Sequence, residues 1–173
     1  AAKVKLIAIT KGERLPDPPS EAMQHGTRYE FQAFQAFVEW LRLNDPKPDV
    51  CHYRGIGFCT LKDEKGVPWV GATPDGVCAS GTLIEIKCRY HQKLPVIKYQ
   101  VPQKDMAQMQ VQMAVTGFKS CWYVQHYNNR GQMRDSCYLA VIKVPYDEEW
   151  WKVNSPKLKR IYTEYYASRD LDL

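Results

Sequence analysis

The sequence lacks the features that mark membrane and secreted proteins. In its 173 residues no apolar run approaches the ~20 residues that a helix needs to cross a bilayer. Residues 1–10 hold no long apolar stretch with a small-residue cleavage site, so no signal peptide is indicated. None of the six cysteines belongs to a Cys-x-x-Cys pair, which argues against a structural zinc site or an iron–sulfur cluster. We therefore expect an intracellular protein, cytoplasmic or nuclear in a eukaryotic host, with reduced cysteines.

Several common catalytic signatures are also missing. The sequence has no P-loop, no Gly-x-Gly-x-x-Gly turn and no Gly-x-Ser-x-Gly nucleophile elbow, which argues against nucleotide-dependent enzymes of those types and against serine hydrolases. It contains no repeats and no low-complexity segment. Hydrophobic residues at 45% and charged residues at 25% are ordinary for a globular protein. The length suits one domain, so we expect residues 1–173 to form a single one.

One stretch lacks acidic residues altogether. From Ile86 to Lys104 there is no Asp or Glu, while the whole chain carries a net charge of +5. The cations of this stretch are Lys87, Arg89, Lys93, Lys98 and Lys104. A segment of one sign attracts phosphates through counterion release, so we assign the last four of these residues to DNA binding. The alternative is a solvated basic loop.

The sequence predicts a mixed α/β order of elements. A helix capped by Ser20 runs to about Leu43, with an apolar stripe of Phe34, Phe37 and Leu41. One step of four before that stripe lies Glu30, on the side expected to be buried. The other expected elements are strands at 53–61, 67–73, 82–90, 120–128 and 136–144, a turn at 76–81, and a helix at 104–117 ending at Gly117.

These elements predict one central sheet of five strands flanked by helices. The first three strands are expected to form a β-meander. The last two strands are expected to be joined by the turn at 129–132. A final helix, capped by Asp147, is expected to bend or break at Pro156.

Residues 71–90, GATPDGVCASGTLIEIKCRY, hold the chemistry-bearing residues. Side chains alternate between the faces of a strand, so Glu85 and Lys87 point the same way. A chain that returns through residues 76–81 brings Asp75 beside Glu85, and Glu30 can approach the same point from the first helix. Three carboxylates and one ammonium group are therefore expected at one edge of the sheet.

Three neighbouring carboxylates repel one another, and a hard divalent cation such as Mg²⁺ relieves that repulsion. Such a cation polarises a phosphodiester oxygen and lowers the pKa of a bound water, and Lys87 can stabilise the charge that builds on the phosphate. Each part also has a plainer interpretation. Glu85 and Lys87 can form a surface salt bridge, Pro-Asp-Gly is commonly only a turn, and Glu30 can reach solvent. The combination favours phosphodiester hydrolysis.

Four motifs, in order, resemble the PD-(D/E)XK nucleases, and most closely the lambda exonuclease group of YqaJ-like viral recombinases, which are related to viral alkaline nucleases. The motifs are Gly-x-x-x-Glu at Gly26 and Glu30, Thr-Pro-Asp-Gly at 73–76, Glu-x-Lys-Cys at 85–88, and MAQMQVQMAVTG, whose first Gln is Gln108. The resemblance spans about residues 20 to 127.

The resemblance implies a restriction-endonuclease-like core and Mg²⁺-dependent digestion of linear double-stranded DNA in the 5′ to 3′ direction, with Mn²⁺ able to replace Mg²⁺. It implies a use in recombination, repair or viral DNA processing. Asp75 and Glu85 would bind the metal with the Ile86 carbonyl, and Glu30 would serve a second metal site. Lys87 would be the catalytic lysine, and Gln108 would lie near the attacking water. Gln112 shares a helix face with Gln108, and the alternative for both is polar helix surface.

Longer members of this group carry an N-terminal Arg that receives the 5′-phosphate, and residues 1–19 show no match to that motif. Arg28 and Arg89, each beside a metal-site motif, are the candidates for this role. The resemblance also implies a homo-oligomer and a single-strand annealing protein as partners. Three alternatives stay open: an endonuclease, an RNA-cutting nuclease with the same metal site, and a non-catalytic nucleic-acid-binding domain.

Overall fold

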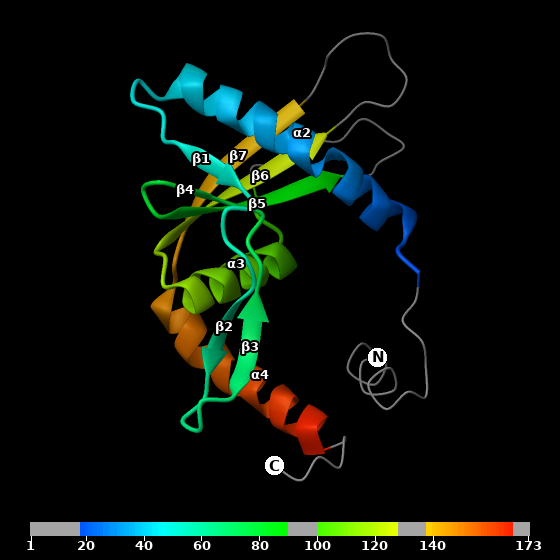
Figure 1. The fold of residues 1–173 in the computed structure, drawn as a ribbon, viewed down its shortest axis with the longest axis vertical. Helices are drawn as coiled ribbons and strands as arrows, with labels where there is room; N and C mark the ends of the chain where they lie inside the picture. Colours follow the sequence, from blue (N-terminus) through cyan, green and yellow to red (C-terminus); the bar gives the residue numbers. More distant parts are fainter. Residues whose placement is uncertain (1–17, 90–99, 128–137, 168–173) are drawn as a thin grey trace.

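A five-stranded sheet lies at the centre of the fold (Figure 1). The computed structural model describes residues 18–89, 100–127 and 138–167. The strand order is β1-β4-β5-β6-β7, in which β5 and β6 are parallel and all other neighbours are antiparallel. The strands are β1 (Cys51–Tyr53), β4 (Gly76–Cys78), β5 (Thr82–Arg89), β6 (Ser120–Tyr127) and β7 (Tyr138–Pro145). The predicted mixed sheet of five strands flanked by helices is confirmed.

Helix α2 (Glu21–Asn44) covers one face of the sheet (Figure 1). The Ser20 hydroxyl accepts a hydrogen bond from the Met23 amide at 3.3 Å, which confirms the predicted N-cap. The apolar stripe of this helix is buried in one cluster with Ile84 and Ile86 of β5. Burial of that stripe holds β5 in place from one side.

Helix α3 (Gln103–Thr116) packs on the opposite face and connects the parallel strands β5 and β6 (Figure 1). Its Met109 and Met113 are buried with Leu83 of β5 and Tyr123 of β6. The helix ends as predicted at Gly117, whose φ of 78° is a left-handed conformation that glycine adopts without strain. Strand β5 is therefore enclosed between two helices.

The predicted β-meander is wrong. Strands β2 (Cys59–Lys62) and β3 (Pro68–Ala72) do form a hairpin, but this hairpin is a separate two-stranded sheet beside α3. The antiparallel partner of β5 is β4, inside the segment expected to be a turn, and β1 pairs with β4. Pro74 has no amide hydrogen for a ladder, so the chain leaves the hairpin there and pairs again from Gly76. Both β1 and β4 have three residues, too few to show an alternating pattern.

Helix α4 (Glu148–Ala167) lies against the hairpin and α3. The carboxylate of Asp147 accepts a hydrogen bond from the Trp150 amide at 2.8 Å, which confirms the predicted cap. The helix was expected to bend or break at Pro156, and it does not break there, because it continues through this residue. Pro156 has no amide hydrogen, so the helix lacks the hydrogen bond to the carbonyl of Lys152. None of the helices in the described ranges combines the length and apolar character that crossing a bilayer requires.

Candidate active site

Glu85 is a carboxylate buried in the sheet. The residue is 1% exposed and lies on the face of β5 that packs against α3. Gln108 donates a hydrogen bond to Oε1 at 2.8 Å, and Gln112 donates one to Oε2 at 2.6 Å. Lys87 forms an ion pair with Oε1. Each carboxylate oxygen therefore has a donor, and these donors offset the cost of burying the charge.

Lys87 connects this buried carboxylate to the surface. It lies two residues after Glu85 on the same face of β5, as the strand alternation predicts. Its ammonium group also donates a hydrogen bond to the Gln108 Oε1 atom at 3.0 Å. With 23% of its side chain exposed, Lys87 lies where a solvent-borne phosphate can reach it.

Asp75 directly precedes β4, the strand that pairs with β5. Its carboxylate accepts a hydrogen bond from the Ile86 amide at 2.7 Å, and its own amide donates to the Ile84 carbonyl at 3.1 Å. A Cβ atom on Gly76 would lie 2.9 Å from the His52 carbonyl oxygen, so the close approach of β1 requires glycine there. The Pro-Asp-Gly sequence thus ends the hairpin, directs a carboxylate at β5 and lets two strands approach.

The two carboxylates perturb each other. Burial, followed by repulsion from Glu85, raises the pKa of Asp75 to about 7, and the bond from the Ile86 amide opposes that rise. Burial also raises the pKa of Glu85, against the opposing effect of Lys87 and Gln112. The structure therefore brings together Asp75, Glu85 and Lys87 as the sequence predicts, and it adds Gln112, to which the sequence assigned no role.

The donor set fits a hard divalent cation. Asp75 and Glu85 supply carboxylate oxygens, and a cation between them would relieve the repulsion that raises the pKa of Asp75. The amide and the carbonyl of a strand residue point toward the same neighbouring strand. The Ile86 amide donates to Asp75, so the Ile86 carbonyl also points to the side of β5 where Asp75 lies. Ile86 lies beyond Ile84, the last residue of β5 that pairs with β4. Among the residues that the structure describes, no group of three or more His, Cys, Asp or Glu side chains is arranged to hold a metal ion.

Glu30 has other partners. Its Oε1 atom accepts hydrogen bonds from the Tyr53 hydroxyl at 2.7 Å and from Arg54 at 3.2 Å. Glu30 adds to the negative potential that raises the pKa of Asp75, yet no bond joins it to Glu85 or Lys87 in the described structure. Burial and the bond to Glu30 raise the pKa of Tyr53 to about 12. Tyr53 ends a strand of three residues and Arg54 follows it, and no sequence pattern marked them.

A cavity of about 570 Å³ adjoins the site between α3, α4 and β3. Gln108 and Gln112 line it together with Thr73, so it shares residues with the cluster around Glu85. Two cations stand on its wall, Lys104, which the sequence assigned to DNA binding, and Lys157, which it did not. Both lysines are exposed.

The remaining residues assigned to DNA binding are placed as follows. Arg28 is exposed on α2. The backbone of Arg89 ends β5, and its side chain is outside the described structure. Lys93 and Lys98 lie outside the described residues.

Solved structures share this fold. The alkaline exonuclease LHK-Exo from Laribacter hongkongensis superposes with a TM-score of 0.73 and 20% identity, over 98% of this chain and 80% of that one. Its complex with dAMP gives the same TM-score and coverage with 22% identity. A phage-related exonuclease from Haemophilus somnus 129PT has a TM-score of 0.62 and 12% identity, over 95% of this chain and 79% of that one. No curated protein matches the chain by sequence.

A family match covers the part of the chain that contains the candidate site. The model of the YqaJ-like viral recombinase domain matches residues 2–119. The matched range contains Asp75, Glu85, Lys87 and both glutamines of α3. The chain thus belongs to the YqaJ-like viral recombinase domain family, the nuclease family that its sequence motifs predict.

Proposed function

We propose that this protein is a Mg²⁺-dependent deoxyribonuclease that hydrolyses linear double-stranded DNA as a 5′ to 3′ exonuclease. The observation that carries the proposal is the ion pair of Glu85 and Lys87 on β5, with Asp75 held beside it by the Ile86 amide and with α3 glutamines on both oxygens of Glu85. A buried acid costs folding free energy, and a binding-only domain has no use for carboxylates beside phosphates. Catalysis gives this arrangement a purpose.

Asp75 and Glu85, with the Ile86 carbonyl, are the residues that would hold the cation. Bound there, Mg²⁺ would lower the pKa of a water and polarise a phosphodiester oxygen. Gln112 holds the Oε2 atom of Glu85 in place through a hydrogen bond of 2.6 Å. Asp75, whose pKa is raised to about 7, must lose its proton to become a ligand.

Lys87 and Gln108 would act on the phosphate and the water. The ammonium group of Lys87 carries the positive charge that offsets the charge developing on the phosphate. Gln108 holds that group through its oxygen and holds Glu85 through its nitrogen, so one amide sets the distance between the two. Glu30, held by Tyr53 and Arg54, is proposed to serve a second cation.

The DNA would approach over the cationic side of the candidate site. We place phosphates on Lys104, Lys93, Lys98 and the added Lys157, and we assign the terminal 5′-phosphate to Arg28 and Arg89. An arginine recognises a doubly charged terminal phosphate through paired hydrogen bonds, which favours a DNA end over an internal phosphate. A homo-oligomer and a single-strand annealing protein are the proposed partners in recombination, repair or viral DNA processing.

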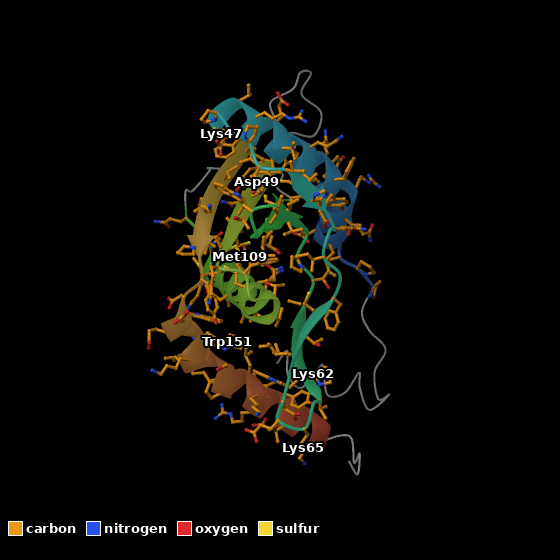
Figure 2. The ribbon with its side chains drawn as sticks, turned by 60° about the vertical axis from the view of Figure 1, so that its left-hand side comes forward. Lys47, Asp49, Lys62, Lys65, Met109 and Trp151 are labelled. Atoms are coloured by element: carbon orange, nitrogen blue, oxygen red, sulfur yellow. The ribbon has the colours of Figure 1, made fainter. Side chains whose placement is uncertain are left out.

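The test is cleavage of a 5′-labelled linear duplex by the wild type, by Lys87→Ala and by the matched control Lys65→Ala. Figure 2 shows Lys65 at the hairpin end of the molecule, away from Met109 at its centre. With Mg²⁺, the wild type and the control are expected to degrade the duplex and Lys87→Ala to leave it intact. All three should be inactive in EDTA.

Two substrates separate the exonuclease from its alternatives. A duplex with a 5′-phosphate should be degraded faster than one with a 5′-hydroxyl, and closed-circular DNA should persist. Cutting of closed circles with equal rates on both ends would make the protein an endonuclease with the same metal site. Faster hydrolysis of RNA would assign it to RNA processing, and full activity of Lys87→Ala would remove the proposed chemistry.

A further inference from the structure

Two cysteines face each other across strands β1 and β4. The register pairs Cys51 directly with Cys78. Hydrogen bonds join Arg54 to Asp75 at 2.8 Å and Ala79 to Val50 at 2.7 Å, one pair at each end of this ladder. Hydrogen-bonded and non-hydrogen-bonded pairs alternate in an antiparallel ladder, so Cys51 and Cys78 form a non-hydrogen-bonded pair.

The geometry of such a pair suits a disulfide. The Cα atoms of a non-hydrogen-bonded pair are about 4.5 Å apart, inside the roughly 4.4–6.8 Å that a disulfide spans. The two Sγ atoms lie 2.6 Å apart, and both cysteines are free thiols in this structure. No backbone movement is therefore required to join them.

The two thiols differ in access and in acidity. Cys51 is half-buried, whereas Cys78 is 1% exposed. A hydrogen bond from the Cys78 thiol lowers the pKa of Cys51, and the same bond together with burial raises the pKa of Cys78. Cys51 is thus the thiol that reacts first, because the thiolate is the nucleophile.

We propose that Cys51 and Cys78 are a disulfide-forming site that exchanges with low-molecular-weight disulfides. The Cys51 thiolate attacks one sulfur of the small disulfide, forms a mixed disulfide and releases one thiolate. Cys78 then loses its proton and attacks the Cys51 sulfur, which releases the second small thiol. Two protein thiols are oxidised and one small disulfide is reduced to two thiols.

The new bond would close a loop that carries part of the candidate site. The 26 residues between the two cysteines include the hairpin β2–β3, Asp75, and the two residues that hold Glu30, Tyr53 and Arg54. Because the two strands are already paired, the bond fixes the edge of the sheet without changing its register. Its effect is to keep β1 and the turn of Asp75 from opening when the protein is heated.

The experiment exposes the full chain to oxidised glutathione without metal or DNA. Peptide mapping under non-reducing conditions should find the Cys51 peptide joined to the Cys78 peptide, with the loss of two hydrogen atoms from the intact mass. The midpoint of thermal unfolding should rise by about 5–10 °C and return on reduction. Because neither readout is nuclease activity, the outcome is independent of the proposed function.

Single variants test the order of reaction. Cys78→Ser should accumulate a glutathione adduct on Cys51, whereas Cys51→Ser should leave Cys78 unmodified. Cys59→Ser, which removes another half-buried thiol, should form the bond as the wild type does. An absent link, a link through another cysteine at similar yield, an adduct on Cys78 in Cys51→Ser, or an unchanged unfolding midpoint would each overturn the proposal.

Discussion

The two faces of β5 are equally buried and chemically opposite. On the face toward α2, Ile84 and Ile86 are 0% and 5% exposed and are buried in an apolar cluster. On the face toward α3, Leu83 is 0% and Glu85 is 1% exposed. Burial is therefore the same on the two faces. What differs is the chemistry of the neighbouring side chains, which are apolar on one face and include hydrogen-bond donors on the other.

The difference between the faces shows what each is for. The α2 face gains stability from the removal of apolar surface from water. The α3 face gives up part of that gain, because a buried carboxylate requires an ammonium group and two amides to be tolerable. Changes on the first face should alter stability, and changes on the second should alter activity.

The largest expected effect is on the polar face. Glu85→Gln keeps the size of the side chain and removes a metal ligand, so the rate of duplex hydrolysis should fall by at least about 10²- to 10³-fold. The buried charge is removed, but an amide nitrogen replaces one acceptor oxygen of Glu85, so the free energy of unfolding should fall by only about 1–3 kcal/mol. Hydrolysis rates and urea unfolding of the same preparations measure both. Wild-type activity of the variant would show that Glu85 is not required for hydrolysis.

The opposite pattern is expected on the apolar face. Ile84→Ala leaves a cavity in the cluster with α2, at a cost of about 2–5 kcal/mol of unfolding free energy. The rate of hydrolysis by the folded fraction should match the wild type, because the side chain points away from Asp75 and Glu85. A shift of the urea midpoint with unchanged specific activity would support this. A large rate loss at full folding would show that the two faces do not act separately.

A pH series in EDTA tests the electrostatics of the polar face. The pKa of Asp75 is raised to about 7 in the fold and is about 3.9 in an unfolded chain. Between these values the folded protein binds the additional proton, so the wild type should lose stability as pH rises through this window. Asp75→Asn does not titrate, so its unfolding midpoint should exceed that of the wild type increasingly from about pH 4 to pH 7. A constant difference would contradict the raised pKa.

The smallest expected effect concerns the cations beside the site. Replacing Lys104 and Lys157 together by Ala should reduce the slope of log K for DNA against log salt by about two units, since each phosphate contact contributes about 0.9 on duplex. Hydrolysis at saturating DNA should change little. The double variant Lys47→Ala with Lys65→Ala, at the two ends of the molecule in Figure 2, is the charge-matched control. An equal change of slope in the two double variants would show that the effect depends on net charge and not on the positions of Lys104 and Lys157.

Sequence alone predicted the long elements and the central pair of acids. The stripe on α2, the Gly117 cap and the Glu-x-Lys alternation on β5 each follow from a period or a local conformation. The short strands β1 and β4 did not, because three residues carry no period and their pairing depends on contacts distant in the chain. For the same reason Tyr53 and Arg54, the partners of Glu30, could not be foreseen.

Gln112 illustrates the same limit within the site. The spacing of four predicted that it shares a helix face with Gln108, and the structure places both on Glu85. Helical spacing shows which residues share a face, but not which strand that face meets. Lys157 depends on the packing of α4 beside α3, which no local pattern specifies.

The most direct test is a titration of the protein with Mn²⁺. The electron paramagnetic resonance signal of the unbound ion measures how much Mn²⁺ stays free. The wild type should bind at least one ion, with affinity falling below pH 7 as Asp75 becomes protonated. Asp75→Asn and Glu85→Gln should each lose that binding, and the control Asp49→Asn should retain it. Wild-type protein that binds no Mn²⁺, or binding that survives in both site variants, would contradict the account.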